Sequence, residues 1–386
     1  MKIRLKDAFD LQMGKTPARN TPAYWNGSYK WVSIADIGSA GKYITATKEG
    51  ITDKAITESG IRAVPAHTVI MSFKLSIGKT AITSEKMYTN EAIMAFVDNG
   101  TYDIDTNYLY HLCCGTRWTE GTNKAVMGLT LNKATLSEKR ISLPEITEQR
   151  NIAAKFDALD NVIEKTQAEL SSLDQLVKSR FVEMFGDPII NEKKWATKKL
   201  DKACIAIVDC PHSTPNYTSE NTGYMCIRTS IVKKNRIMWE KIEYIKEDEY
   251  YTRIQRKRPG KGDIIYTREG AILGIAAVID RECNVALGQR SMLLSPDKKQ
   301  CTSEFLSVAM NCDSFLSNAL KGQSGSASPH INVGDIKDFQ MIMPPISQQR
   351  QFSAFVSEVD KSKLAVKQSL EKLETLKKSL MQQYFG

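Results

Sequence analysis

Apolar residues recur at alternating steps of four and three positions over two long stretches of the chain. The first stretch has Thr166 as its one polar member and otherwise consists of Ile152, Phe156, Leu159, Ile163, Leu170, Leu173 and Val177. The second has Lys363 and Lys377 at two positions and otherwise consists of Phe352, Val356, Val359, Val366, Leu370, Leu373 and Leu380. A period of about 3.5 residues kept this long is typical of helices that pack along a partner helix. Each stretch therefore predicts a long helix with a coiled-coil seam.

The two stretches are copies of one another at an offset of 200 residues. Residues 143–186 and 343–386 align without a gap, beginning with (L/M)-P-x-I-(S/T)-x-Q-R and ending with Phe-Gly. The copies divide the chain into a variable block 1–142, a helix, a variable block 187–342 and a second helix. This circular order predicts two equivalent halves related by a pseudo-two-fold axis, with the chain termini close together.

The ends of each predicted helix carry suitable capping residues. Thr147 and Ser347 are the predicted hydroxyl N-caps, and Gly186 and Gly386 are the predicted left-handed C-caps. Each helix should run for about 35 residues, or roughly 50 Å.

The charges of the two predicted helices are complementary. Residues 143–186 have 5 basic and 8 acidic residues, and residues 343–386 have 7 and 4, which gives net charges of −3 and +3. Opposite charge favours pairing of the two helices with each other, and the pseudo-two-fold order makes that pair antiparallel. The alternative is a helix that packs only on its own domain. The net charge of +9 lies in the two blocks.

The blocks combine strand and helix patterns. Residues 67–73 and 262–268 are predicted to be equivalent strands, as are residues 92–96 and 291–294, and a helix is expected from 303 to 320. The predicted fold class is α+β, with two mixed α/β domains separated by two long antiparallel coiled-coil helices. Because the blocks share a plan but differ in detail, they should share a fold and bind different things.

Composition excludes several classes of protein. The chain is 42% hydrophobic and 25% charged, the balance of a folded globular protein. No apolar run is long enough to span a membrane, and the N-terminal residues do not resemble a signal peptide, so a cytoplasmic location is expected. The 8 cysteines form no C-x-x-C pair and are expected to be buried free thiols, and no metal site is predicted.

Basic residues beside aromatic and amide side chains point to nucleic acid. Arginine forks suit guanine edges, and Asn or Gln amides suit adenine. The loop at 322–330, and residues 121–124 at its place in the first block, could offer backbone N–H groups to a phosphate. For any single residue the alternative is a solvated surface charge or a core aromatic. The candidate DNA-binding residues are Tyr24, Trp25, Asn26, Lys30, Lys74, Lys79, Arg117, Asn123, Lys124, Arg228, Lys233, Lys234, Arg236, Arg253, Arg256, Lys257, Arg258, Arg268, Arg290, Gln323, Ser324, Ser326 and His330.

The sequence contains only incomplete matches to catalytic motifs. Lys79 lies in a Gly-Lys-Thr that resembles the end of a phosphate-binding loop, but Phe73 replaces the first glycine of that motif. Glu192 begins a Glu-Lys-Lys that resembles the tail of a nuclease motif, without an acidic partner on a preceding strand. We therefore predict no catalytic residue in this chain.

The four-part order of blocks and repeats resembles the specificity subunit of Type I restriction-modification systems over the whole chain. The repeat motif and its helices carry the resemblance, and Gly325–Ile331 and His212–Pro215 are also similar to segments of that family. Residues 123–127 depart from it, since they lack the Gly-Ser-Ala-Ser-Pro character of the second copy.

The resemblance implies that residues 1–142 and 187–342 are target recognition domains, each reading one half of a bipartite, asymmetric target in double-stranded DNA. It implies that the helices set the spacing and dock two methyltransferase subunits, which methylate adenine with S-adenosylmethionine. Restriction subunits that use ATP and Mg would join through the complex, and no cofactor would bind this chain. Three alternatives stay open: a standalone DNA-binding regulator with the same fold, a coiled-coil scaffold, and a self-sufficient enzyme, the least favoured.

Overall fold

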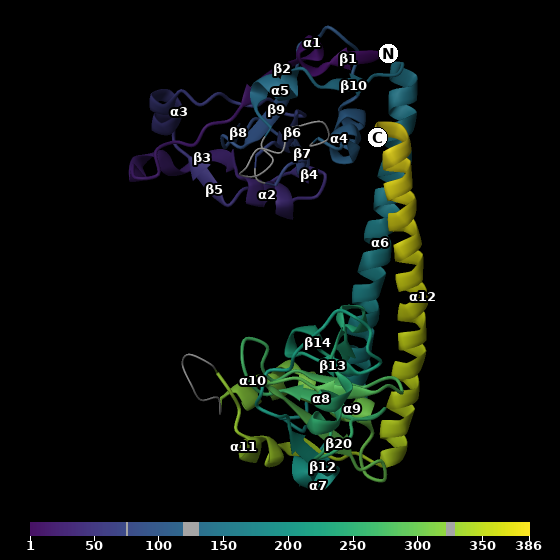
Figure 1. The fold of residues 1–386 in the computed structure, drawn as a ribbon. Coiled ribbons are helices and arrows are strands. Elements are labelled where there is room, and N and C mark those ends of the chain that lie inside the picture. The colour runs from purple at the N-terminus through teal and green to yellow at the C-terminus, as the bar shows by residue number, and fades with distance from the viewer. Residues whose placement is uncertain (75, 119–130, 322–328) are drawn as a thin grey trace. The chain divides into compact units, whose positions relative to one another are not determined.

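Two compact units make up the chain in the computed structural model (Figure 1), which describes residues 1–74, 76–118, 131–321 and 329–386. Unit 1 combines residues 1–167 with residues 368–386, and unit 2 is residues 168–367. The helices α6 (Ile146–Phe185) and α12 (Ile346–Phe385) are each 40 residues long and contribute to both units. Each unit therefore joins one variable block to a part of both long helices. The two chain termini lie near each other within unit 1, as the circular order predicts (Figure 1).

The central sheet of unit 1 has five strands in the order β2-β9-β6-β7-β4, antiparallel except for the β7–β4 pair. The strands are β2 (Phe9–Met13), β9 (Ile93–Asp98), β6 (Val69–Ser72), β7 (Thr80–Thr83) and β4 (Tyr43–Ile44). Val69 and Met71 belong to one hydrophobic core, and Ile70 belongs to another. Because successive side chains of a strand point to opposite faces, this sheet is covered on both sides.

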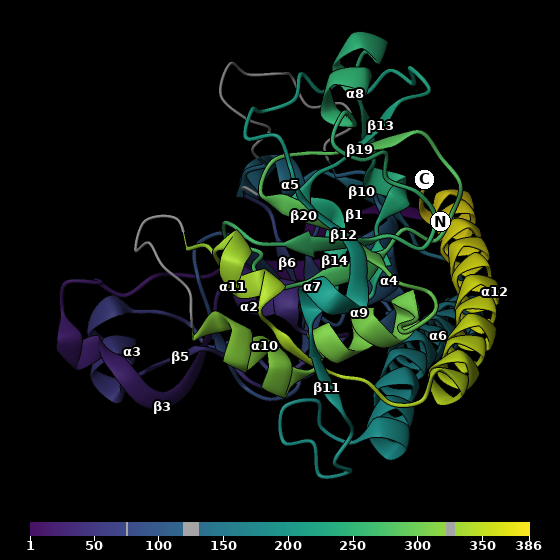
Figure 2. The same cartoon turned by 90° about the horizontal axis from the view of Figure 1, so that it is seen from below.

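A second sheet of unit 1 has three strands in the order β5-β3-β8, with β3 antiparallel to β5 and parallel to β8. This sheet and its neighbours are β3 (Trp25–Val32), β5 (Glu49–Ile51), β8 (Tyr88–Thr89), η1 (Pro22–Tyr24) and α3 (Asp53–Ser59). Figures 1 and 2 show β3, β5 and α3 at the end of unit 1 opposite α6. The other elements are β1 (Lys2–Arg4), which pairs with β10 (Arg140–Ser142), and α1 (Leu5–Ala8), α2 (Ile34–Ser39), α4 (Thr106–Gly115) and α5 (Lys133–Ser137).

Unit 2 repeats this connectivity. Its sheets β12-β20-β17-β18 and β16-β13-β19 correspond to β2-β9-β6-β7 and β5-β3-β8, with the same parallel and antiparallel pairs. These strands are β12 (Cys204–Asp209), β20 (Ser291–Pro296), β17 (Ile264–Thr267), β18 (Ala276–Val278), β16 (Glu243–Tyr244), β13 (Met225–Ile227) and β19 (Val285–Leu287). The predicted strand equivalences, and the shared fold of the blocks, are confirmed.

The remaining elements of unit 2 flank these sheets. They are β11 (Thr197–Lys199), which pairs with β21 (Gln340–Ile342), and α7 (Leu200–Ala203), η2 (Thr229–Ile231), β14 (Val232–Lys233), β15 (Arg236–Ile237), η3 (Trp239–Lys241), α8 (Glu247–Arg253), α9 (Ser303–Asn311), α10 (Asp313–Leu320) and α11 (Val333–Lys337). The single helix expected from 303 to 320 is wrong, because Cys312 is extended and separates α9 from α10. Asn311, whose side chain bonds both backbone groups of Ala276, fixes the end of α9 against β18.

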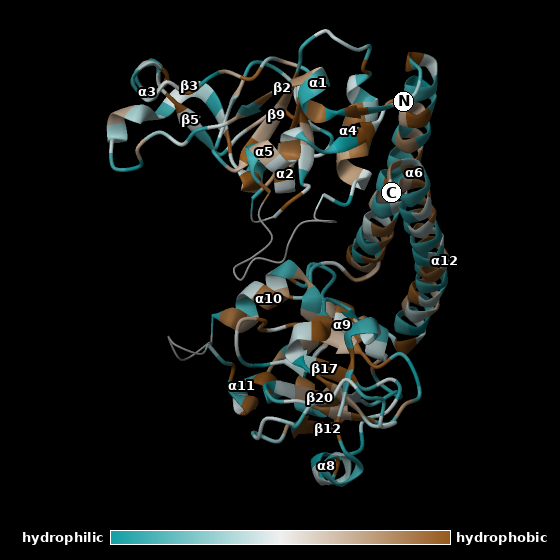
Figure 3. Ribbon diagram, turned by 45° about the horizontal axis from the view of Figure 1, so that its top comes forward, coloured by the Kyte–Doolittle hydropathy of each residue, from teal (hydrophilic) through white to brown (hydrophobic). Residues whose placement is uncertain are grey.

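The predicted seam forms within each unit, and Figure 3 shows hydrophobic and hydrophilic residues alternating along both helices. In unit 1 the rings of Phe156 and Phe385 lie 5.5 Å apart, and Lys377 Nζ is 2.5 Å from Asp160 Oδ1. Going forward along α6 from Phe156 to Asp160, the contacted residue of α12 moves backward from Phe385 to Lys377, so the two helices run antiparallel. All predicted seam residues of both helices are buried or half-buried.

Unit 2 pairs its own parts of the two helices in the same way. Phe181 and Phe352 have ring centroids 5.6 Å apart, and Lys363 Nζ lies 2.8 Å from Asp174 Oδ1. The two lysines that interrupt the apolar seam of α12 are thus each matched by an aspartate of α6. This match gives the opposite net charges of the two helices a specific location.

A buried glutamine of the repeat motif fastens α6 to the block of unit 1. The side chain of Gln149 is 1% exposed, and its Nε2 donates to the carbonyls of Pro144 and Asp103, both at 3.0 Å. Its Oε1 accepts from the backbone N–H of Asp105 at 2.9 Å, and Asp105 is the N-cap of α4. One side chain therefore holds the start of the long helix against the start of a helix in the block.

Gln349 makes the same three contacts in unit 2. It is fully buried, donates to the carbonyls of Pro344 at 2.8 Å and Gln300 at 3.1 Å, and accepts from the N–H of Thr302 at 3.1 Å. Thr302 is the N-cap of α9, the counterpart of α4. The glutamine of the motif thus has the same structural role in both copies.

The predicted caps are partly correct. Thr147 and Ser347 lie inside the first turn rather than at the N-cap, because the carbonyls of Glu145 and Pro345 already accept helical hydrogen bonds. Gly186 directly follows α6 with φ of 75°, which confirms the left-handed C-cap there.

Candidate nucleic-acid interface

One edge of the central sheet in unit 2 brings together charged residues from three strands. Asp209 ends β12, Arg268 and Glu269 directly follow β17, and Arg290 directly precedes β20. Strand β20 is antiparallel to both neighbours, and the registers place its start against the ends of β12 and β17. These four residues therefore meet at one end of the sheet, where its strands begin or end. We call this group of four residues the unit 2 edge; the name does not refer to an outer strand.

A buried ion pair forms the base of the unit 2 edge. The guanidinium of Arg268 is 8% exposed and grips Asp209 with Nε to Oδ1 at 2.8 Å and Nη2 to Oδ2 at 3.1 Å. The exposed ring of His212 places Nε2 3.2 Å from Asp209 Oδ2, and Arg256 Nη1 donates to the Asp209 carbonyl at 3.3 Å. Two-point pairing fixes both planar groups, so Arg268 has little freedom to turn outward.

The turn between β19 and β20 places a second arginine beside Arg268. Arg290 has φ of 69°, the left-handed region, and its carbonyl accepts from the N–H of Arg268 at 3.0 Å. The Gln289 side chain donates to the carbonyl of His212 and ties the turn to the loop after β12. Arg290 is exposed, and within the described residues its guanidinium makes no hydrogen bond or ion pair.

The segment before α11 joins the same edge. Glu269 and His330 form an isolated antiparallel bridge, and Gly270 N–H donates to the Pro329 carbonyl at 3.0 Å. His330, a predicted site residue, is half-buried there. The candidates that lie outside the described residues are Asn123, Lys124, Gln323, Ser324 and Ser326.

The corresponding edge of unit 1 has the same backbone and different side chains. By strand register Asp209, Arg268 and Arg290 correspond to Met13, Phe73 and Ala92, which with Lys74 we call the unit 1 edge. The N–H of Phe73 donates to the carbonyl of Ala92 at 3.0 Å. Lys74 is half-buried, with Nζ 5.3 Å from the ring centroid of Phe73.

The aromatic candidates of unit 1 take part in packing. The rings of Trp25 and Trp31 meet edge to face at 5.1 Å, and the guanidinium of Arg19 lies 3.9 Å from the Trp25 centroid. The Tyr24 hydroxyl donates to Glu58 at 2.7 Å. Trp25 and Tyr24 are half-buried, so their contact with DNA stays a prediction.

The other candidates of unit 1 lie on or beside β3, β7 and α4. Asn26 is exposed with φ of 62°, and Lys30 forms an ion pair with Glu85. Lys79 and Arg117 are exposed. Among the described residues, no hydrogen bond, ion pair or ring contact joins Asn26, Lys30 or Lys79 to Lys74.

Arg253 is held inside unit 2. Its guanidinium lies 3.0 Å from Glu249 Oε1 and donates to the Ser213 carbonyl at 3.0 Å. At 8% exposure, this side chain stabilises the junction between α8 and the loop after β12. A contact of Arg253 with DNA is not tested by this arrangement and stays a prediction.

Most other basic candidates of unit 2 are bonded to neighbours. The pairs are Arg228 with Glu243 at 2.6 Å, Lys234 with Asp313 at 2.9 Å, Lys257 with Asp263 at 3.2 Å and Arg258 with Asn284 at 2.8 Å. Lys233 and Arg236 occupy the β14–β15 hairpin. Of the predicted cations, the structure brings Arg256, Arg268 and Arg290 together.

Sequence reasoning missed the acidic and amide partners of these arginines. Asp209 and Glu269 were not predicted as site residues, nor was Gln289. A strand ending in aspartate, followed by the His212 segment, is the one local signal that could have found Asp209. The pairing itself links residues 59 positions apart and depends on strand register.

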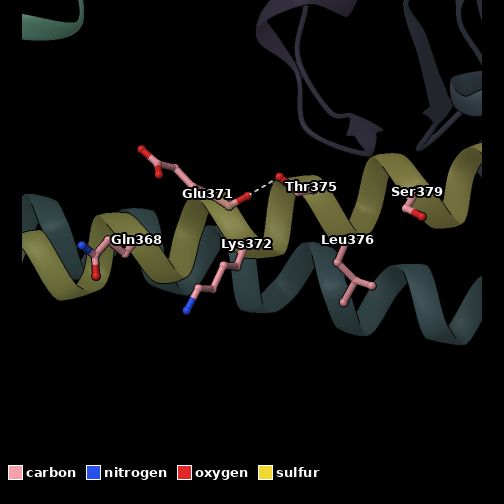
Figure 4. Close-up of a pocket in the computed structure, with 6 residues that line it drawn as sticks. All are labelled: Gln368, Glu371, Lys372, Thr375, Leu376 and Ser379. Atoms are coloured by element: carbon pink, nitrogen blue, oxygen red, sulfur yellow. Dashed lines mark hydrogen bonds between the residues drawn. The ribbon is translucent and has the colours of Figure 1, made fainter.

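A second candidate surface lies on the long helices. In unit 1 a shallow groove on α12 is lined by Gln368, Glu371, Lys372, Thr375, Leu376 and Ser379 (Figure 4). Leu376 is 49% exposed, and its repeat counterpart Leu176 on α6, in unit 2, is 46% exposed. An apolar residue kept outside the seam at the same position of both copies suits contact with another protein.

The described residues offer little catalytic chemistry. They contain no group of three or more His, Cys, Asp or Glu side chains placed to hold a metal ion. The eight cysteines are free thiols, and burial raises the pKa of Cys204, Cys226 and Cys312 to about 12, so these three are poor nucleophiles. The expectation that all are buried is wrong for Cys114, which is exposed at the end of α4, and Cys204 and Cys283 are only half-buried. No helix in the described parts of the chain is both long and apolar enough to cross a membrane.

A family model matches the chain twice. The model described as "Type I restriction modification DNA specificity domain" covers residues 1–175 and residues 192–376. Two curated relatives come from Methanocaldococcus jannaschii. The Type I restriction enzyme MjaIX specificity subunit is 24% identical, covering 92% of this chain and 85% of the relative. The MjaVIII specificity subunit is 21% identical, with coverage of 98% and 90%.

Solved structures show the same fold. A structure described as "Structural basis underlying complex assembly and conformational transition of the type I R-M system" matches with a TM-score of 0.61 and 18% identity, covering all of this chain and 97% of the other. The S subunit of a Type-I restriction-modification system from M. genitalium matches with a TM-score of 0.54 and 14% identity, covering 100% and 96%. Both likenesses extend over the two sheet-rich units and the long helices.

Proposed function

The chain belongs to the family of Type I restriction-modification DNA specificity domains, and we propose that it selects the double-stranded DNA sequence on which such a system acts. Each variable block is a target recognition domain that reads one half of a bipartite, asymmetric target. The helices set the gap between the halves and dock two methyltransferase subunits. Restriction subunits join the assembly through that complex.

The observation that carries this proposal is the contrast between the two sheet edges. Both units keep one backbone frame, yet the unit 1 edge offers Met13, Phe73 and Lys74, whereas the unit 2 edge offers Asp209, Arg268 and Arg290. Two readers on one scaffold with different side chains suit two different half-sites. A net charge of +9 adds a sequence-independent attraction to phosphates.

The long helices support a spacing and docking role. A continuous helix of 40 residues is roughly 60 Å long, enough to pass along more than one turn of duplex DNA. The seam is satisfied within each unit, so the exposed Leu176 and Leu376 remain for other proteins. Because the docking position occurs once in each repeat copy, two methyltransferase subunits are the natural number.

The chemistry of the complex belongs to its partners. In this proposal S-adenosylmethionine binds the methyltransferase subunits, and ATP and Mg act with the restriction subunits. This chain contributes binding and orientation through its own residues. The buried thiols and paired carboxylates described above take no part in bond making.

Exchange of one variable block is the direct test. The chain is co-expressed with its methyltransferase subunit, and methylated adenines are mapped by sequencing. Residues 1–142 are then replaced by the same block of another family member. We expect one half of the methylated motif to change while the other half and the gap stay the same.

Two results would contradict the proposal. A change in both halves would show that the blocks do not read independently. Sequence-specific DNA binding by the chain alone, with no methyltransferase copurifying and no methylated motif, would instead favour a standalone regulator.

A further inference from the structure

We propose that Arg290 reads a guanine in the half-site recognised by unit 2. The inference deepens the proposed function and rests on it. Arg290 projects from the end of the central sheet where β12 and β17 end and β20 begins. Of the three arginines there, Arg268 is committed to Asp209, and Arg256 donates to a backbone carbonyl. Arg290 is therefore the arginine of this cluster whose guanidinium has all its N–H groups unbonded among the described residues.

The position of Arg290 is fixed on both sides. Its backbone lies in the left-handed region and accepts a hydrogen bond from Arg268, while Gln289 ties the turn to His212. The side chain folds over Gly270, where Nη1 would lie 3.4 Å from a Cβ atom. The fixed backbone gives the exposed side chain a defined starting point, which lowers part of the ordering cost of binding a base edge.

The ion pair of Arg268 with Asp209, at the same end of the sheet, contributes by charge. Asp209 neutralises Arg268 in a nearly buried position, so the two arginines do not repel each other as two free cations would. Arg268 and Asp209 are therefore positioning residues, and Arg290 alone makes the contact.

A base edge suits this surface better than a phosphate does. Glu269 lies on the same edge, half-buried, and its carboxylate makes no ion pair within the described residues. A free carboxylate repels phosphate oxygens, but it accepts a hydrogen bond from cytosine N4. An arginine fork donates to O6 and N7 of guanine in the same groove. The combination of Arg290 and Glu269 thus matches a G·C pair.

The unit 1 edge has no equivalent of this reader. Ala92 occupies the place of Arg290, and Phe73 that of Arg268. We therefore expect the guanine to be read in one half of the target only, the half that unit 2 recognises.

The test uses the complex of the full chain with its methyltransferase subunit. Methylation rates are measured on duplexes in which each position of the unit 2 half-site carries each of the four base pairs. The variant Arg290→Gln should lose discrimination at one G·C position, by roughly 5- to 150-fold, the range for one bidentate contact. Arg290→Lys should lose most of that discrimination as well, because lysine lacks the fork. Rates at the other positions should keep their order.

Lys299→Gln provides the matched control. Lys299 is exposed just beyond the other end of β20, so the variant loses the same charge near that strand without touching the unit 2 edge. It should leave the discrimination at every position unchanged.

Two outcomes would overturn the assignment of Arg290. One is a unit 2 half-site without any G·C pair. The other is an equal loss of rate on all duplexes in Arg290→Gln, the signature of a phosphate contact. In both cases the wild-type complex still methylates a two-part motif, so the proposed function survives. A wild-type complex with no sequence preference would instead refute the proposed function itself.

Discussion

In unit 1 the N–H of Phe73 donates to the carbonyl of Ala92, and in unit 2 the N–H of Arg268 donates to the carbonyl of Arg290, both at 3.0 Å. The same hydrogen bond thus closes the same strand end in both units. The side chains on it are apolar in one unit and charged in the other. The comparison separates what builds the edge, which is backbone pairing, from what the edge can recognise.

The attachment of each block to the long helices likewise has a part that both units share and a part that differs between them. Gln149 and Gln349 make matching contacts, so this part of the attachment is common to both units. Next to it, unit 1 has His111 bonded to Asp157, where unit 2 has Val308 and Ser357. A shared attachment combined with variable surroundings allows a block to change its recognition without losing its place on the helices.

The largest expected effect concerns the charged edge. Asp209→Ala removes the only carboxylate that contacts the nearly buried Arg268 among the described residues. Leaving one partner of a buried pair uncompensated should lower the free energy of unfolding of unit 2 by about 3 kcal/mol. Hydrogen exchange resolved by peptide should show the loss of protection in β12, β17 and β20.

Met13→Ala is the matched change in unit 1. Met13 is 44% exposed, and its truncation should cost less than about 0.5 kcal/mol. If both variants lowered the free energy of unfolding by the same amount, the ion pair would not stabilise the unit 2 edge more than Met13 stabilises the unit 1 edge.

The glutamines of the repeat motif come next. Gln149→Leu and Gln349→Leu each leave two carbonyls and one N–H without their partner. Each unsatisfied buried group costs about 1–3 kcal/mol, reduced where water can enter, so each variant should lose about 2 kcal/mol. Chemical denaturation of the full chain, combined with hydrogen exchange in α4 and α9, measures this loss.

Equality of the two losses is the informative result. A loss confined to one variant would show that the two attachments differ despite their matching hydrogen bonds. Gln149→Glu and Gln349→Glu serve as controls, since each keeps the size of the side chain and its acceptor oxygen and removes the amide donor.

The long helices could be predicted from sequence because the seam requires only that apolar residues recur at a local spacing and be buried. A residue such as Phe156 must be covered wherever it occurs in the 4-3 pattern, and the local period identifies it. The lysines of the seam could be recognised as interruptions, but their aspartate partners could not. Asp160 and Asp174 are identified only when the register between α6 and α12 is known.

The candidate site was less predictable because the type of a residue does not determine where its side chain points in the fold. Arg253 has the chemistry of a DNA contact, yet its guanidinium is nearly buried and bonds the carbonyl of Ser213 in the loop after β12. Asp209 ends β12 and Arg290 precedes β20, far apart in sequence, and only sheet register joins them to Arg268. The spacing of basic residues along the chain carries no information on that register.

The seam ion pairs should have a smaller effect, and a different one in each unit. Asp160→Lys brings two lysines together in unit 1 and should cost about 1 kcal/mol, and adding Lys377→Asp should restore most of it. The pair of Asp174 with Lys363 should show weaker coupling, because Asp174 is 65% exposed whereas Asp160 is 26% exposed. Double-mutant cycles measured by thermal unfolding give both values. Stronger coupling in unit 2 would contradict the link between exposure and pair strength.

The smallest expected effect belongs to unit 1 alone and appears on acidification. Burial lowers the pKa of His111, whose Nε2 lies 2.7 Å from Asp157 Oδ1, while its Nδ1 is buried without a partner among the described residues. Lys42 Nζ, 2.5 Å from the same oxygen, adds to the lowering.

In the unfolded chain His111 takes up a proton near pH 6.5, whereas in the folded chain it resists doing so. The unfolded state then binds more protons, so unit 1 should lose stability as the pH falls from 7.5 to 5.5. The pKa of Asp157 is also lowered, but its ordinary value lies near 3.8, below this window. His111→Val, which copies unit 2, should flatten the loss in denaturation measured across this range. An unchanged slope in the variant would assign the pH dependence to another group and would make the two units alike in this respect.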